Sequence, residues 1–247
     1  MPDSETRAPA TRSQTDVVVH GIRELVVRGA LRPGDRLPIE KELAAELGVS
    51  RGSLREGVRA LALMGVLETR QGDGTYVTAL DASLLIAPMG FVIDMQAEGQ
   101  SVEIAAVRRV LEAEAAALAA RSFGAEGIAA LRSILAGIAH LVDEPSEEDH
   151  ERMLEADIAL HEAIARTAAN PVLEALIQAL SSRTLRSRLW RSVSEEGAIA
   201  RTFQQHTAIV DALETGDPDR ARTAMNAHLY DVQGFATSRS ADDAPSP

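Results

Sequence analysis

The sequence contains no cysteine, and aromatic residues make up only 3% of its 247 positions. The absence of cysteine excludes disulfide bonds and thiolate metal sites, so any bound metal must be held by His, Asp or Glu. No run of about 18 apolar residues is present, which is the length that a membrane-spanning helix needs. The first residues, MPDSETRAPATRSQ, lack the apolar core of a secretion signal. These absences predict a cytoplasmic protein with no membrane partner.

The negative charge of the chain is distributed unevenly. The formal net charge is −12 at pH 7. Residues 14–78 hold nine Lys/Arg and nine Asp/Glu, whereas residues 79–247 hold 14 and 26, so the whole excess lies in the second part. A neutral first part whose arginines gather on one element can still approach DNA, because the local field matters more than the total charge.

Residues 14–78 predict three helices in a helix-turn-helix arrangement. Apolar residues at helical spacing indicate a first helix over about 16–28, which the glycines and prolines of RGALRPGDRLP end. A second short helix, IEKELAAEL, closes on Gly48, and Ser50 is suited to cap the N-terminus of a third. Two short helices joined by a tight turn containing glycine are typical of a helix-turn-helix.

The third helix carries an apolar seam and a row of arginines. The apolar residues lie within a narrow arc: Leu54, Val58 and Leu61. The arginines follow a stripe about 100° round the helix from that arc: Arg51, Arg55 and Arg59. One face can therefore pack while the other enters the major groove, where Arg binds guanine through two hydrogen bonds and serines such as Ser50 and Ser53 suit phosphate. An arginine stripe alone is more often a solvated helix face.

The segment GVLETRQGDGTYVTA alternates between apolar and polar residues on either side of Gln-Gly-Asp-Gly, which predicts a β-hairpin. Beside a helix-turn-helix such a hairpin forms a wing along the minor groove or the DNA backbone. From Ile22 to Val77 the sequence resembles, without a gap, the winged-helix domain of GntR-superfamily transcription regulators, through LRPGDRLP, LAAELGVSR, LRE and GTYV. The resemblance implies DNA contacts by Lys41, Arg51 and Arg55, with Gly72 and Gly74 shaping the wing. The acidic Asp73 at the wing tip departs from a phosphate-binding wing.

Beyond a linker at 79–83 the chain predicts helices only, packed as an antiparallel bundle of about six to seven over residues 84–237. Ser146 with Asp149 resembles a capping box at the start of one of them. The expected helices are 84–95, 102–122, 125–142, 147–168, 172–190, 195–215 and 218–236. We expect the arm at 1–13 and the tail at 238–247 to be disordered. The predicted fold class is thus mostly α, a winged helix-turn-helix followed by a helical bundle.

Asp157 and His161 stand at i and i+4, on one face of a helix, where they could hold one ion together. From spacing alone, each of His161, His206 and His228 is more often an ordinary helix histidine. Residues 84–237 also resemble the ligand-binding FCD domain of the FadR-type branch of the GntR superfamily, through VEIAAVRRVLEAEAAALAA and DIALHEAIARTAANPVLEAL. The resemblance implies a divalent ion, either zinc, nickel or manganese, bound by one Asp and three His. The four positions are Asp157, His161, His206 and His228.

The resemblance further implies a small organic acid as effector, with Arg108 contacting its carboxylate. The alternative for Arg108 is a structural ion pair with Glu112, four residues on. Four more arginines could line the pocket or lie on the surface and are not assigned: Arg183, Arg186, Arg188 and Arg191.

The sequence therefore predicts a homodimeric repressor that binds a palindromic DNA operator and responds to an acid bound over a metal. One alternative is a metal-dependent, hydrolase-like enzyme in which Glu155 or Glu162 acts as the base. Another keeps the DNA-binding domain and makes the metal purely structural.

Overall fold

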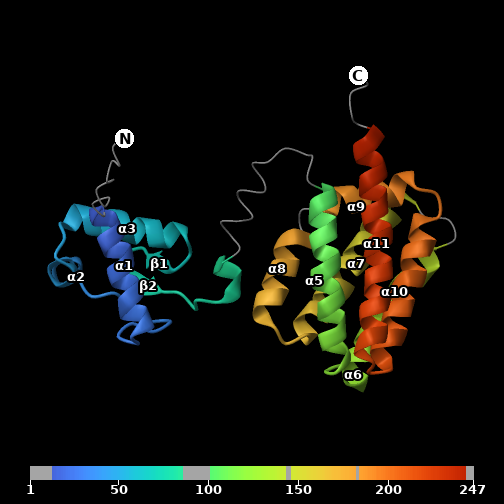
Figure 1. Ribbon diagram of the computed structural model, residues 1–247, viewed down its shortest axis with the longest axis horizontal. Coiled ribbons are helices and arrows are strands. Elements are labelled where there is room, and N and C mark those ends of the chain that lie inside the picture. Colours follow the sequence, from blue (N-terminus) through green and yellow to red (C-terminus); the bar gives the residue numbers. More distant parts are fainter. Residues whose placement is uncertain (1–12, 86–100, 143–145, 182–183, 243–247) are drawn as a thin grey trace, which may run out of the picture. The chain divides into compact units, whose positions relative to one another are not determined.

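The computed structural model describes residues 13–85, 101–142, 146–181 and 184–242 (Figure 1). The chain divides into two units, residues 1–88 and 89–247. This division lies a few residues beyond the predicted linker at 79–83. A short 3-10 helix, η1 (Ala82–Leu85), begins within that linker. The expected helix at 84–95, most of the N-terminal arm and the last five residues of the tail lie largely outside the described residues.

The N-terminal unit has the predicted order of three helices and a hairpin. Ser13 accepts a hydrogen bond from the backbone N–H of Asp16, whose carboxylate accepts one from Ser13, so a capping box starts the first helix. Gly48 ends the second helix in the left-handed conformation, with φ +67°. The elements are α1 (Gln14–Val27), α2 (Glu40–Leu47), α3 (Arg51–Leu63), β1 (Leu67–Arg70) and β2 (Gly74–Val77).

The helix α3 packs against α1 through a position that admits only glycine. A Cβ atom on Gly57 would lie 2.4 Å from Cγ1 of Val18. Leu54 and Leu61 of the predicted apolar seam are buried, and Val58 is partly buried against the same core. The opposite side of α3 therefore remains exposed with its arginines.

The wing is a two-stranded antiparallel hairpin in which Leu67 pairs with Val77. The backbone before α2 extends it, since the N–H of Leu37 donates to the carbonyl of Thr75 at 2.8 Å. The guanidinium of Arg36 crosses over Gly74, where a Cβ would lie 2.5 Å from Nε. These contacts tie the wing to the helix-turn-helix.

The C-terminal unit is helical throughout its described part. Figure 1 shows α5 and α11 running side by side in opposite directions, with α10 beside α11. The predicted capping box of Ser146 and Asp149 starts α7. The helices are α5 (Ser101–Ala120), α6 (Ala125–Ile138), α7 (Glu147–Thr167), α8 (Pro171–Ser181), α9 (Leu185–Ser194), α10 (Ala198–Glu214) and α11 (Pro218–Asp242).

Two predictions about these helices were wrong. The expected single helix over 172–190 is divided into α8 and α9, and Thr184 at the division donates its hydroxyl to the carbonyl of Ser181 at 3.1 Å. Such local side-chain bonds compete with the helical ladder. The helix α11 continues to Asp242, past the expected onset of disorder at 238, because no proline occurs before Pro245.

Apolar side chains from α5, α6, α7, α10 and α11 form the core of this unit, including Leu160, Ile209 and Met225. Asp157, His161, His206 and His228 belong to three of these same helices and are buried with them. Among the described residues, no helix is long and apolar enough to cross a bilayer.

Candidate metal centre and DNA-binding surface

Four buried side chains converge inside the C-terminal unit. Asp157 and His161 come from α7, His206 from α10 and His228 from α11, and one ligand atom of each lies within 4.8 Å of the others. The three imidazole centroids are 4.7 to 5.5 Å apart. Asp157, with 6% exposure, is the most exposed of the four. The structure therefore brings together all four residues that the sequence predicted as ligands.

The ring nitrogens at this centre have the surroundings of metal ligands. Nε2 of His161 and both ring nitrogens of His206 are buried and have no hydrogen-bond partner among the described residues. Nε2 of His206 lies 3.2 Å and Nε2 of His161 3.6 Å from Oδ1 of Asp157. Buried polar atoms without partners are costly, and a cation among them would remove the cost. Three imidazoles and a carboxylate fit zinc, nickel or manganese.

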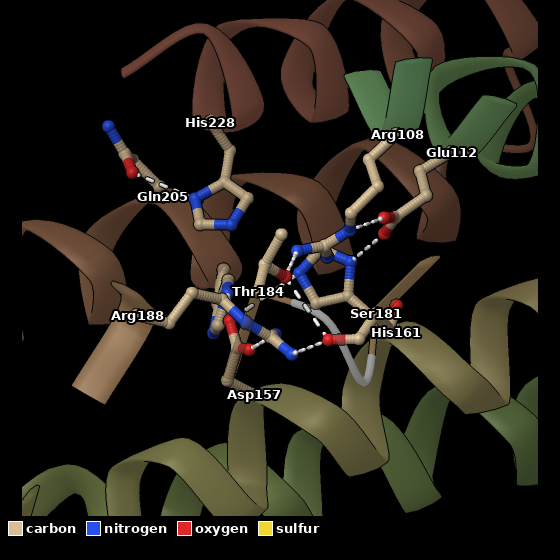
Figure 2. Close-up of polar contacts among 10 residues, drawn as sticks. Arg108, Glu112, Asp157, His161, Ser181, Thr184, Arg188, Gln205 and His228 are labelled. Atoms are coloured by element: carbon tan, nitrogen blue, oxygen red, sulfur yellow. Dashed lines mark hydrogen bonds and ion pairs between the residues drawn. The ribbon is translucent and has the colours of Figure 1, made fainter. Parts of the chain in front are cut away.

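Two neighbouring side chains orient the histidines. Nδ1 of His161 donates to Glu112 of α5, and Nδ1 of His228 contacts Oε1 of Gln205 at 2.9 Å (Figure 2). A hydrogen bond at Nδ1 fixes the tautomer that leaves Nε2 free to bind a metal. From the sequence, Glu112 is predicted only as a partner for Arg108 and Gln205 is not predicted at all, because both roles depend on contacts between helices.

Arg108 makes the ion pair with Glu112 that the sequence offered as the alternative to an effector contact. Its Nε donates to Glu112 at 2.7 Å, which is the expected ion pair, and Nη1 donates to the hydroxyl of Thr184 (Figure 2). Nη2, however, is buried and has no hydrogen-bond partner in the described part of the chain. The ion pair therefore leaves one donor of this guanidinium unsatisfied beside the metal centre.

Arg188, which the sequence left unassigned, reaches the same centre. Its Nη1 donates to Oδ2 of Asp157 and Nη2 donates to the carbonyl of Ser181 at 3.2 Å, while Nε is buried without a partner. Arg191 is buried as well, but it pairs with Glu195 and Asp231. Arg183 and the side chain of Arg186 lie outside the described residues.

The charge states at the centre suit a cation. Burial would raise the pKa of Asp157, but the charges of Arg188 and the neighbouring histidines outweigh it and hold the pKa well below its ordinary value. Burial likewise opposes ionisation of Glu112, yet Arg108 and His161 lower its pKa to about 2. Burial lowers the pKa values of His206 and His228. Ionised carboxylate and neutral imidazole are the forms that bind metals.

A small cavity of about 40 Å³ adjoins the centre. Its lining includes Asp157, Arg188 and His228 together with Met153 and Thr202. A water molecule needs about 10–15 Å³, so the cavity is large enough to admit water beside the four ligands.

The predicted DNA-binding residues lie on the N-terminal unit. Ser50 caps α3 by accepting from the N–H of Ser53 at 3.0 Å. Arg51, Arg55 and Arg59 are all exposed along the helix, and Lys41 is exposed on α2. The row of cations is therefore available to a ligand of this unit.

Gly72 and Gly74 occupy two positions of the wing that favour glycine. Gly72 turns the hairpin in the left-handed conformation, with φ +75°, and Gly74 leaves space for Arg36. The carboxylate of Asp73 accepts from the hydroxyl of Tyr76 at 2.7 Å and lies 3.7 Å from Nη1 of Arg36. The acid at the wing tip is thus paired within the wing.

Comparison with known proteins identifies both units. Residues 14–77 match the family model described as bacterial regulatory proteins, gntR family, and residues 103–231 match that of the FCD domain. The chain is 30% identical to the HTH-type transcriptional regulator LutR of Bacillus subtilis over 85% of its length and 94% of that protein. It is also 30% identical to the galactonate operon transcriptional repressor of Escherichia coli, over 87% of the chain and 93% of the relative.

A solved structure, Streptococcus agalactiae GntR, has the same fold, with a TM-score of 0.63 and 24% identity over 89% of this chain and 99% of that one. The matched families and relatives are transcriptional regulators, so these comparisons do not support the enzyme alternative. Of its two suggested bases, Glu155 is exposed on α7 and Glu162 is partly buried. The chain therefore belongs to the GntR family of bacterial transcriptional regulators and carries an FCD domain behind its DNA-binding helix-turn-helix.

Proposed function

We propose that this chain is a cytoplasmic homodimeric repressor whose affinity for a palindromic operator is controlled by a small organic acid at the metal centre. The observation that carries the proposal is the buried cluster of Asp157, His161, His206 and His228, whose unpartnered ring nitrogens lie beside two incompletely paired arginines. That a relative is a galactonate operon transcriptional repressor favours repression over activation.

The helix α3 would enter the major groove with its N-terminal residues against the bases. Arg51, Arg55 and Arg59 would contact bases and phosphates, while Lys41, Ser50 and Ser53 would contact the DNA backbone. Gly72 and Gly74 would give the wing the shape that it needs beside the helix. A two-fold dimer presents two such helices, which matches a palindromic operator.

In the C-terminal unit the four ligands would hold zinc, nickel or manganese, and a bound ion of this kind offers open positions to a carboxylate. The charge balance of the site supports an anionic effector. The negative charges of Asp157 and Glu112 balance the positive charges of Arg188 and Arg108. A bound dication would therefore give these four side chains and the ion a net charge of plus two, which an anionic effector would reduce. Nη2 of Arg108 and Nε of Arg188 are the free donors that an acid would satisfy.

The cavity of about 40 Å³ beside the four ligands is partly open to solvent and is the place where an acid would enter. Polar Thr202 and the guanidinium of Arg188 lie in the same lining as apolar Met153.

The experiment that tests this function is thermal denaturation of chelator-treated protein with a panel of organic acids, each with and without zinc, nickel or manganese. A ligand at 100 times its dissociation constant stabilises the folded state by about 2.7 kcal/mol. An acid that raises the melting temperature only when metal is present would support the proposal. If metal alone stabilises and no acid adds to it, the ion is structural and the proposed control by an acid is wrong.

A further inference from the structure

The guanidinium of Arg55 is held by a carboxylate from a different helix. Nε of Arg55 donates to Glu40 of α2 at 2.9 Å to Oε1 and 3.1 Å to Oε2, and Nη2 donates to Oε2 at 2.8 Å. Both side chains are exposed to solvent, by 62% and 51%. The other arginine pair of α3 differs, because Nη1 of Arg59 reaches Glu56 of its own helix through a single contact at 3.0 Å.

The contact with Glu40 occupies one edge of the guanidinium and leaves another free. An arginine has five N–H donors in a planar fork. Glu40 takes the edge formed by Nε and Nη2. Nη1 and the second hydrogen of Nη2 form a second edge, which no described residue occupies. That edge presents two parallel donors, which is the arrangement that binds O6 and N7 of guanine in the major groove.

The ion pair between Arg55 and Glu40 contributes little to the free energy of unfolding. Ion pairs between exposed side chains contribute little, because water screens them and two long side chains lose freedom. What the contact with Glu40 does change is the freedom of Arg55, since two hydrogen bonds from one planar group fix its orientation. A side chain that is already oriented loses less entropy when it binds.

We infer that Glu40 is a positioning residue for DNA recognition, which holds Arg55 so that its free edge meets a guanine at one fixed position of each operator half-site. This inference rests on the proposed entry of α3 into the major groove. It assigns a function in base selection to an acidic side chain of α2, although an acid near DNA would by itself oppose binding to phosphate.

The test compares the base preferences of Glu40→Ala and Glu42→Ala. Glu42 lies in the same first turn of α2, is also exposed, and has no ion pair with another described residue, so its variant matches the change in charge. Each full-length protein would select sites from a pool of double-stranded DNA with a random central region. Affinities for the site preferred by the wild type and for a scrambled site would then be measured at one salt concentration.

We expect Glu40→Ala to lower, by about tenfold, the affinity for the preferred site divided by the affinity for the scrambled site. In the selected DNA, the guanine at one position of each half-site should become variable. Glu42→Ala should keep both. In an Arg55→Ala background, the additional change Glu40→Ala should no longer alter the ratio. Circular dichroism of the variants would verify that the fold is retained.

Two results would overturn the inference. If Glu40→Ala binds the preferred site more tightly and with unchanged base preference, Glu40 is a competitor that DNA must displace. Equal behaviour of the two variants would show that the contact has no role in recognition. If the wild type itself selects no sequence, the proposed operator binding fails instead, which is a separate outcome.

Discussion

At the scale of single residues, the candidate metal centre is marked by buried groups without partners. His206 is fully buried, yet neither of its ring nitrogens has a hydrogen bond to another described residue. The sequence predicted the four ligands through resemblance to the FCD domain, since the spacing of Asp157 and His161 alone is common on helices. The role of Glu112 at His161 could not be predicted, because it joins residues 49 positions apart on different helices.

We predict that His206→Ala abolishes the stabilisation by metal. The variant loses one of four ligands, so the difference in melting temperature between metal-loaded and chelator-treated protein should disappear, whereas the cavity left by the ring affects both states alike. His140→Ala, at an exposed histidine after α6, is the control and should keep the full difference. A metal shift in His206→Ala equal to that of the wild type would exclude His206 as a ligand.

A second residue-scale prediction concerns the partner of His161. Glu112→Gln should weaken metal affinity by about 10 to 100-fold, because it removes the charge that orients and polarises the ligating imidazole. The measurement is competition with a zinc chelator of known affinity. The control is Glu114→Gln, which changes an exposed glutamate on the same helix and should leave the metal affinity unchanged. Identical affinities for the two variants would show that Glu112 serves only Arg108.

Arg55 is the residue whose loss should most reduce sequence recognition. Arg55→Ala should weaken binding to the preferred site by about tenfold to a hundredfold, as expected for a contact with two hydrogen bonds to one base, and should weaken random DNA much less. Band-shift titrations on both DNAs would measure the two losses. Equal losses on both would make Arg55 a phosphate contact without base selection.

At the scale of elements, most of the fold could be predicted because each boundary has a local cause. The caps at Ser50 and Ser146 and the turn at Gly72 are visible in the sequence and occur as predicted. The division between α8 and α9 at Thr184 could not be predicted, because no glycine or proline marks it. Arg188 lies on α9, just after this helix boundary. Its contact with Asp157 therefore could not be predicted from the spacing of apolar residues in the sequence.

The packing of α1 on α3 leads to a prediction about Gly57. Gly57→Ala would place a methyl group 2.4 Å from Cγ1 and 2.5 Å from Cβ of Val18, so it should lower the free energy of unfolding by about 1–3 kcal/mol despite its better helix propensity. Gly52→Ala on the same helix, where the nearest atom is 3.7 Å away, should stabilise by about 0.5–1 kcal/mol. Chemical denaturation would compare them. Similar gains in both variants would contradict the close packing.

At the scale of the whole molecule, the chain combines a DNA-binding unit of the gntR family with an acidic unit that contains the FCD domain. The net charge of −12 is carried by residues 79–247, while residues 14–78 are neutral in sum and expose their arginines on α3. A regulator of this kind works through a coupling free energy between its two sites. The coupling must be reciprocal, so operator DNA and acid must change each other's affinity by the same factor.

Reciprocity gives a quantitative expectation. If the acid weakens operator binding by a given factor, saturating operator DNA should weaken acid binding by that same factor. Calorimetric titration of the acid into metal-loaded protein, with and without the selected operator, measures this second factor. A change in only one of the two affinities would mean that the acid and the DNA do not act on one equilibrium of the protein.

The most direct test of the proposed control by a metal-bound acid measures operator affinity for two forms of the protein, chelator-treated and zinc-loaded. Each form is measured without acid and with the acid that raises the melting temperature of the metal-loaded protein. The account predicts that the acid changes operator affinity in zinc-loaded protein and has no effect after chelation. An equal effect of the acid with and without metal, or no effect in either, would contradict it.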